Sequence, residues 1–350
     1  MENQNKPLFV TGGTGLVGSH LIYTLITKGE RVRAIHRKTS NREILEKVIG
    51  YYKDDKDKLL KFVEWIECDI CDYDILEKTM KGAEIVYHCA AAVSFENRNK
   101  DYVLDNNIKG TSNIVKACFA NKIRKLCHVS SNAALGAYDG ESLVNETHSW
   151  DEEGYRSPYG ISKYLSEQEV WKGIRDGLNA VIVNPTIILG PGGWSRGSSS
   201  FFPKIHSGLL FYTGGTNGYV NVNDVVKAMI ILTNSNISGE RFIVNAENLD
   251  YGRFFGMISE SLKVRKPFMR VPKVLSYMAF PLVSLLEILS KGKTTLTKEM
   301  LKVAWSHITY DNSKLIKYTG FSFTPIEKTV KAIGEIYLEE MRGILRYRSE

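Results

Sequence analysis

The stretch SPYGISKYLSE contains Tyr159 and Lys163, which are four residues apart. On a helix, side chains at this spacing project from one face. A nearby ammonium favours the phenolate and lowers the pKa of a tyrosine from its reference value near ~10. Ser130 and Ser131 end the stretch CHVSS and can point a hydroxyl at a substrate carbonyl; a hydrogen-bonded turn after a strand is their alternative role. Together these residues predict a site in which Tyr159 gives or takes a proton near neutral pH.

A glycine-rich turn, TGGTGLVG, lies near the start of the chain. Gly12 permits a tight turn after the apolar PLFV, Gly15 lets the backbone approach a phosphate, and Gly18 lets the next helix pack closely. The N-terminus of that helix offers free N–H groups and partial positive charge to a pyrophosphate. The turn predicts a dinucleotide site, but its first interval is one residue longer than in the commonest fingerprint, so the glycines alone do not decide the matter.

The residues after the second predicted strand bear on which dinucleotide binds. NAD sites place an acidic residue about 20 positions beyond the glycines, where it accepts both ribose hydroxyls. Here RVRAI is followed by His36, Arg37 and Lys38, and then by Thr39 and Ser40. Two cations suit a 2′-phosphate, so NADPH is favoured as cofactor and NADH is the alternative. An ordinary basic loop after a strand would contain the same residues.

Asp69 ends the stretch WIECD, where it is placed to accept a hydrogen bond from an adenine amino group. Its alternative role is to cap a helix that begins near Asp72. Cys68 and Cys71 form a C-x-x-C, but no second pair or His-x-His partner follows, so no metal site is predicted. Five cysteines without regular spacing do not describe a disulfide framework, which favours a reducing compartment.

Up to about residue 185, short apolar runs alternate with helix-length amphipathic segments. Strands that are apolar almost throughout, each followed by a helix, imply a parallel sheet covered on both faces. The predicted fold class is therefore α/β, a doubly wound parallel sheet of the Rossmann type, whose ligands lie at the carboxyl ends of the strands. The predicted strands are PLFVT, RVRAI, FVEWI, EIVYHC, KLCHVS and NAVIVN, and the predicted helices span 15–28, 72–81, 99–121 and 157–176.

The sequence predicts two units, a dinucleotide-binding domain over 1–185 and a smaller substrate lobe over 186–350, some of whose elements return to the first domain. The segment 271–290 is apolar over most of its length, but its charges and central Pro281 argue against a membrane-spanning helix. A buried or surface-docking helix pair is one reading of this segment. An apolar flap facing substrate or membrane is the other, so peripheral membrane contact stays open.

Composition and charge limit the classes of partner that the chain is expected to bind. With 43% hydrophobic and 24% charged residues, the chain can bury an ample core. The net charge of +7 comes from 46 basic and 39 acidic residues, and no basic stretch is interleaved with aromatics, so no nucleic-acid partner is predicted. The N-terminal MENQNKPLFV lacks the basic and apolar regions of a signal peptide, so we expect a cytoplasmic protein. As a separate expectation, the protein is a monomer or a homodimer.

The chain resembles the extended short-chain dehydrogenase/reductases over nearly all of its length. The resemblance rests on ordered blocks that each look like the family block expected at that place. They are TGGTGLVGSHL, CDICD, VYHCAAAV, NNIKGTSNIV, HVSSNAALG, PYGISK, VNPTIILGP, YVNVNDVVKA and YDNSKLIKYTGF. A Rossmann domain with a C-terminal substrate lobe is what this resemblance implies.

The resemblance also implies roles for single residues. Ser131 matches the catalytic Ser/Thr, Tyr159 the acid/base, and Lys163 the lysine that holds the nicotinamide ribose. The predicted cofactor-binding residues are Gly12, Thr14, Gly15, Leu16, Val17, Arg37, Lys38, Asp69, Ile70, Ala90, Ala91, Asn107, Ser130, Tyr159, Lys163, Pro185 and Ile188. The predicted substrate-facing residues are Val93, Phe95, Asn132, Trp194 and Phe201.

The block VNPTIILGPGG looks like the dihydroflavonol reductase and 3β-hydroxysteroid dehydrogenase branch of this family. Asn132 and Ala133 stand where the sugar-nucleotide dehydratases carry an Asp-Glu pair, which makes an elimination improbable. The implied reaction is hydride transfer from NADPH to a ketone or aldehyde, with Tyr159 protonating the alkoxide and Ser131 stabilising it. A nucleotide-sugar 4-epimerase and a non-catalytic dinucleotide sensor are the alternatives.

The residues after 186 favour an apolar substrate over a sugar nucleotide. From 186 to 232 the cations that could meet a diphosphate are sparse, whereas the same stretch is rich in Phe and Leu that could line an apolar cleft. A steroid-like, polyphenol-like or long-chain ketone is therefore expected, with 3-keto sphingoid bases among the candidates. Core packing of these apolar residues is the alternative.

Overall fold

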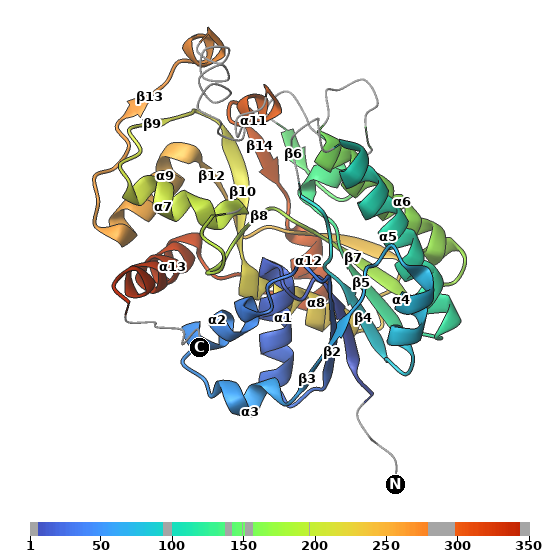
Figure 1. Cartoon of the computed structure of the whole chain (residues 1–350). Helices are drawn as coiled ribbons and strands as arrows, with labels where there is room; N and C mark the ends of the chain where they lie inside the picture. Colours follow the sequence, from blue (N-terminus) through green and yellow to red (C-terminus); the bar gives the residue numbers. More distant parts are fainter. Residues whose placement is uncertain are drawn as a thin grey trace.

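A seven-stranded parallel sheet runs through the molecule (Figure 1), whose computed structural model describes residues 6–93, 100–136, 142–148, 150, 157–195, 197–278 and 298–343. Every neighbouring pair of strands in this sheet is parallel. In spatial order the strands are β11 (Glu240–Val244), β7 (Ala180–Pro185), β5 (Lys125–Val129), β4 (Ile85–His88), β1 (Leu8–Thr11), β2 (Val32–His36) and β3 (Val63–Glu67).

Alternation along each strand explains why helices cover both faces. Leu8 and Val10 of β1 belong to one apolar core and Phe9 to the opposite one, because successive side chains of a strand point to opposite faces. The first core is closed by α1 (Leu16–Thr27), α2 (Glu43–Tyr51), α3 (Lys56–Leu60), α8 (Val222–Thr233) and α12 (Ser313–Thr319). The second core is closed by α4 (Tyr73–Met80), α5 (Lys100–Ala120) and α6 (Pro158–Arg175).

This architecture is the doubly wound Rossmann fold, so the predicted fold class is confirmed. All six predicted strands lie in the sheet, and the four predicted helices correspond to α1, α4, α5 and α6. The seventh strand, β11, lies far along the chain and was not among the predicted strands. The strand β11 and the helices α8 and α12 come from the C-terminal half of the chain and pack with this sheet. The predicted domain boundary at residue 185 stays a prediction.

A smaller lobe packs beside the carboxyl edge of the sheet (Figure 1). Its core joins three helices to a three-stranded sheet, and two short parallel pairs lie outside that core. The helices are α7 (Phe201–His206), α9 (Tyr251–Leu262) and α13 (Ile326–Met341), and the strands are β8 (Ile187–Leu189), β10 (Thr216–Asn221) and β12 (Glu247–Asp250). The pairs are β9 (Phe211–Tyr212) with β13 (Met269–Arg270) and β6 (Ser142–Val144) with β14 (Ile308–Tyr310).

Three short helices complete the described elements: α11 (Lys298–Val303) and the 3-10 helices Asn132–Leu135 and Gly197–Ser200. Of the segment 271–290, residues 271–278 are described and 279–290 lie outside the described residues. None of the helices in the described ranges is both long and apolar enough to cross a bilayer.

Candidate active site

The turn between β1 and α1 is packed so closely that two of its glycines have no space for a side chain. Gly12 has φ +67°, and a Cβ there would lie 2.6 Å from the backbone nitrogen of Ala90. A Cβ on Gly18 would clash with the carbonyl oxygen of Gly12. Gly15 precedes α1, and no side chain caps the helix there. A helix N-terminus without a side-chain cap, preceded by a glycine-rich turn, fits the pyrophosphate of a dinucleotide.

A buried histidine ties this turn to the neighbouring strand and helix. His88, the last residue of β4, lies between Thr11 Oγ1 (2.8 Å from Nδ1) and Thr111 Oγ1 (3.0 Å from Nε2). Thr11 Oγ1 also accepts a hydrogen bond of 3.1 Å from the backbone N–H of Ala90. Burial lowers the pKa of His88 to about 3, so the ring is neutral. His88 was not among the site residues predicted from the sequence.

The loop after β4 is held from α5. Asn107 accepts from the backbone N–H of Ala92 at 2.7 Å and donates both to the Ala92 carbonyl oxygen, at 2.9 Å, and to Ser162 Oγ. Val93, one residue further, is 63% exposed. Phe95 lies outside the described residues. Asn107 therefore fixes the loop that carries Ala90 and Ala91, whose contact with the cofactor stays a prediction.

The predicted binding site for the adenosine end of the cofactor lies at the carboxyl ends of β2 and β3. Arg37 and Lys38 are exposed, and the Arg37 guanidinium donates to the Tyr102 hydroxyl at 2.7 Å. In the register of β2 and β3, Glu67 is the partner of His36, the residue before the two cations. The two cations predicted to meet a 2′-phosphate are therefore exposed to solvent, and this contact stays a prediction.

Asp69 does not cap the helix that follows it. Its carboxylate accepts from the Cys71 backbone N–H at 2.9 Å, and Asp72 caps α4 by accepting from Ile75 N. The alternative role suggested for Asp69 is thus wrong, and its contact with adenine stays a prediction. The five cysteines are free thiols. Within the described ranges, no group of three or more His, Cys, Asp or Glu side chains could hold a metal.

The proton-transfer residues meet where β5 ends and α6 begins. Ser157 caps α6 by accepting from Gly160 N at 2.7 Å, and Pro158 takes the first helical position. This start places Tyr159 in the first turn and Lys163 one turn later, on the same face. Tyr159 is hydrogen-bonded to Ser131. The buried Lys163 ammonium donates to the Val129 carbonyl oxygen, two residues before Ser131, at 2.9 Å.

Burial decides the protonation of both groups. It lowers the pKa of Lys163 to about 8, which leaves the amine charged at neutral pH. It raises the pKa of Tyr159, and the hydrogen bond with Ser131 only opposes that rise. The expectation that Lys163 lowers the pKa of Tyr159 is therefore wrong for this structure, because burial is the largest effect. Tyr159 is protonated at neutral pH and can donate a proton.

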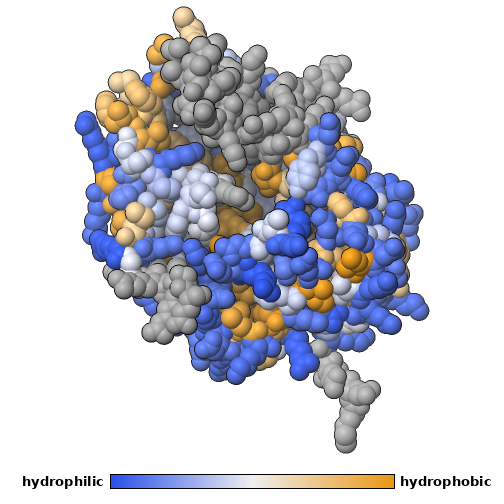
Figure 2. Space-filling model, viewed as in Figure 1, coloured by the Kyte–Doolittle hydropathy of each residue, from blue (hydrophilic) through white to orange (hydrophobic). Residues whose placement is uncertain are grey.

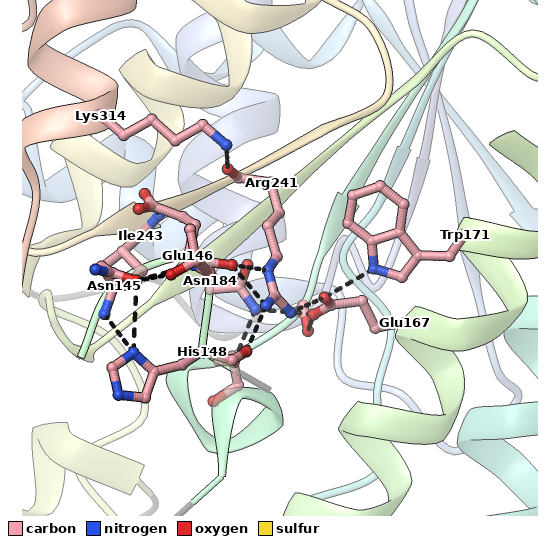
Figure 3. A network of polar contacts seen from close by, with 12 residues as sticks. Asn145, Glu146, His148, Glu167, Trp171, Asn184, Arg241, Ile243 and Lys314 are labelled. Carbon is pink, nitrogen blue, oxygen red and sulfur yellow. Dashed lines mark hydrogen bonds and ion pairs between the residues drawn. The ribbon is translucent and has the colours of Figure 1, made fainter. Parts of the chain in front are cut away.

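Glu167 and Arg241 form an ion pair within a network of polar contacts (Figure 3). Glu167 of α6, 1% exposed, pairs with Arg241 of β11 at 3.0 Å. The same carboxylate accepts from the Ser130 hydroxyl at 2.6 Å and from the Asn184 amide at 2.8 Å. That Asn184 amide also donates to the Ser131 carbonyl oxygen at 3.0 Å. Glu167 thereby joins α6, β5, β7 and β11 directly behind Ser131, and its charge raises the pKa of Lys163 against the effect of burial.

This pair was not recognised in the sequence. Glu167 follows Lys163 by four residues and Tyr159 by eight, so the helical spacing that groups the first two residues also places it on their face. Arg241 carried no such signal, because it is 74 residues from its partner. The Ser130 hydroxyl donates to Glu167, and the predicted contact of Ser130 with the cofactor stays a prediction.

The predicted substrate-facing residues do not gather in one place. Asn132 adjoins the Ser131 hydroxyl, and its amide donates to the Tyr310 hydroxyl at 2.8 Å. Trp194 donates instead to Glu340 of α13 at 2.7 Å. Phe201 packs edge-to-face on Phe254, with ring centroids 5.6 Å apart. Trp194 and Phe201 are partly buried against the lobe core, whereas Asn132 lies beside the proton-transfer residues. The predicted contacts of these residues with substrate stay predictions.

The remaining predicted cofactor-binding residues lie near the carboxyl edge of the seven-stranded sheet, except Ile188, which lies in β8 of the three-stranded sheet. The loop at 190–193 closes this edge, since His20 of α1 bonds the Pro191 carbonyl oxygen at 3.0 Å. The residues are Thr14, Leu16 and Val17 at the start of α1, Ile70 after β3, Pro185 at the end of β7 and Ile188 in β8. Their roles stay predictions.

Comparison with known proteins places this site in a family. The model of the NAD dependent epimerase/dehydratase family matches residues 8–245. The chain is 28% identical to the sterol demethylase protein B of Methylococcus capsulatus, over 75% of this chain and 76% of that protein. It is 26% identical to a putative dihydroflavonol 4-reductase of Synechocystis over 92% of both chains. It is also 30% identical to a putative UDP-glucose 4-epimerase of Methanocaldococcus jannaschii, over 65% of this chain and 73% of that protein.

The family match covers more than half of the chain and spans the glycine turn, Ser131, Tyr159 and Lys163. Their arrangement at the carboxyl edge of a doubly wound sheet fits a bound nicotinamide dinucleotide. The chain belongs to the NAD dependent epimerase/dehydratase family, and it is an NAD(P)-dependent enzyme of the extended short-chain dehydrogenase/reductase type.

Proposed function

We propose that this protein is an NADPH-dependent reductase of a bulky, largely apolar ketone or aldehyde. The observation that carries the proposal is the hydrogen bond between a protonated Tyr159 and Ser131 beside the buried ammonium of Lys163. This arrangement offers a carbonyl oxygen two hydroxyl groups and one fixed positive charge. The similarity to a putative dihydroflavonol 4-reductase and to a sterol demethylase protein supports a ring-containing apolar substrate.

The chain's own residues manage the proton and the developing charge. When bound, NADPH supplies a hydride to the carbonyl carbon. The Ser131 hydroxyl stabilises the negative charge that grows on the carbonyl oxygen. Tyr159 gives its phenolic proton to that oxygen, which completes the alcohol. Solvent then reprotonates the phenolate left on Tyr159, whose raised pKa favours the return of the proton.

The small number of cations between 186 and 232, and their separation, support an apolar substrate over a sugar diphosphate. From 186 to 232, Lys204 and Lys227 are the cations within the described residues. Lys227 of α8 lies over the ring of Phe321, 4.9 Å from its centroid, in the layer that covers the sheet. A diphosphate generally needs several convergent cations, and these two lysines lie on different helices.

The cofactor preference is tested by removing the cations after β2. In the double variant Arg37→Ala/Lys38→Ala, the dissociation constant for NADPH rises at least about tenfold, because the 2′-phosphate loses two charge-assisted partners. The constant for NADH changes far less. Titration of intrinsic fluorescence with each cofactor measures both. Arg31→Ala/Lys61→Ala is the matched control, because both residues are exposed cations at the opposite ends of β2 and β3. Tighter binding of NADH than NADPH by the wild type overturns the preference.

A nucleotide-sugar 4-epimerase is the second candidate, because the chain is also related to a putative UDP-glucose 4-epimerase. One turnover comparison separates the two functions. The purified enzyme with NADPH is offered a panel of steroid, polyphenol and long-chain ketones, including a 3-keto sphingoid base, and is offered UDP-sugars in parallel with NAD⁺. The proposal expects NADPH oxidation with at least one apolar ketone. Conversion of UDP-sugars without any oxidation of NADPH by the ketones replaces it with the epimerase.

A further inference from the structure

An exposed apolar surface lies at the edge of the C-terminal lobe, over β9, β13 and a helical segment at 273–278. Orange and tan atoms gather there in the upper left of Figure 2. We call it the lobe-edge surface. Its eight residues, each between 43% and 72% exposed, are Leu210, Phe211, Phe268, Met269, Val274, Leu275, Tyr277 and Met278. Large apolar side chains that gather in one place on a folded domain indicate an interaction site.

The backbone holds these side chains in place. Phe211 pairs with Met269 in the parallel ladder of β9 and β13, and the Val271 N–H donates to the Tyr212 carbonyl oxygen at 3.0 Å. The helical segment is fixed from a distant part of the chain, because Trp305 Nε1 donates to Ser276 Oγ at 2.8 Å. The lobe-edge surface is thus preformed, and binding through it requires little ordering of the chain.

The charges within this surface have one sign. Between 263 and 278 the sequence has five basic residues and no Asp or Glu. All five are exposed. The guanidinium of Arg265 lies 4.6 Å from the ring centroid of Phe268, so positive charge and apolar surface adjoin. Lys266 is paired with Glu260, and the other four basic residues have no ion pair within the part of the chain that the structure describes. The five are Lys263, Arg265, Lys266, Arg270 and Lys273.

We propose that the lobe-edge surface docks onto an anionic lipid bilayer. Exposed Met, Leu, Val and Phe side chains enter the boundary between headgroups and acyl chains, and the cations beside them meet lipid phosphate and carboxylate groups. A second copy of this chain fits the same surface poorly, because a two-fold contact would face the five cations with those of the partner. The proposal does not depend on the substrate, so vesicle binding is tested without turnover.

Sedimentation with vesicles measures this binding. We expect the full-length protein to sediment with vesicles of phosphatidylcholine containing about one third phosphatidylserine, and far less with phosphatidylcholine alone. Arg265→Gln/Lys273→Gln lowers the partition coefficient by about 30-fold, from the typical contribution of each basic residue near a charged membrane. Val274→Asp/Met278→Asp lowers it at least as much, and both of its positions are 72% exposed, so the fold is retained.

The controls carry the same substitutions elsewhere. Lys58→Gln/Lys61→Gln removes two exposed cations near β3, and Ile75→Asp replaces an apolar side chain that is 44% exposed on α4. Both controls should bind vesicles like the wild type. Failure of the wild type to bind anionic vesicles, or equal losses in lobe-edge and control variants, overturns the proposal. A third outcome also overturns the proposal: the wild type does not bind vesicles, light scattering shows that it is a dimer, and Val274→Asp/Met278→Asp converts the dimer to a monomer.

Discussion

Tyr159→Phe lowers the turnover number by roughly 10² or more, the range expected when a general acid is lost. The substitution removes the hydroxyl that is hydrogen-bonded to Ser131 and leaves the ring in the first turn of α6. Affinity for the dinucleotide stays nearly unchanged, because the glycine turn and Lys163 are intact. Steady-state turnover and a fluorescence titration of the same preparation separate these two effects.

Tyr164→Phe is the matched control for this prediction. Tyr164 lies on the same helix, and its ring stacks on Trp150 with centroids 4.2 Å apart, a contact that phenylalanine retains. Its turnover should equal that of the wild type. Full activity in Tyr159→Phe removes the proposed mechanism, whereas equal losses in both variants assign the effect to the packing of α6 rather than to proton transfer.

The second large effect concerns stability. Arg241→Met lowers the free energy of unfolding by about 3–5 kcal/mol, because it leaves the buried Glu167 carboxylate without its cation. Arg241 also donates to the carbonyl oxygens of Glu146 and His148, at 2.6 and 2.8 Å from its Nη2 atom. The substitution leaves these two oxygens without that donor. Urea denaturation followed by circular dichroism measures the change.

An exposed ion pair supplies the comparison. Lys56 and Glu46 lie 3.1 Å apart with both side chains at least 40% exposed, so Lys56→Met should leave the free energy of unfolding nearly unchanged. The double variant Arg241→Met/Glu167→Gln should regain part of the stability, because the carboxylate charge is removed together with its partner. A loss in Arg241→Met no greater than that in Lys56→Met contradicts the view that this pair holds the site together.

The fold and the proton-transfer residues could be predicted because their signals are local. An apolar run followed by an amphipathic segment identifies each strand and helix, and the helical spacing of Tyr159 and Lys163 places them on one face of α6. The glycine turn is equally local, since Gly12 and Gly18 are constrained by neighbours within the turn and by the adjoining strand.

What the sequence did not reveal depends on contacts between distant segments. Asn132 meets Tyr310 across 178 residues, and Trp194 meets Glu340 across 146. No periodicity joins such pairs, so the contact of Trp194 with α13 could not be predicted from the sequence. The pKa of Tyr159 was misjudged for a related reason: the spacing to Lys163 was visible, whereas the burial that raises the pKa arises only when the sheet, α6 and the loop after β5 pack together.

The central claim, net hydride transfer from cofactor to a carbonyl substrate, is tested most directly with NADPH deuterated at C4 of the nicotinamide. The enzyme is incubated with the most active ketone of the panel, and the product is analysed by mass spectrometry. The account predicts one deuterium on the new carbinol carbon for each cofactor oxidised, and loss of this transfer in Tyr159→Phe. Absence of deuterium from every product, together with interconversion of UDP-sugars in the presence of NAD⁺ without net change in the cofactor, would contradict the account.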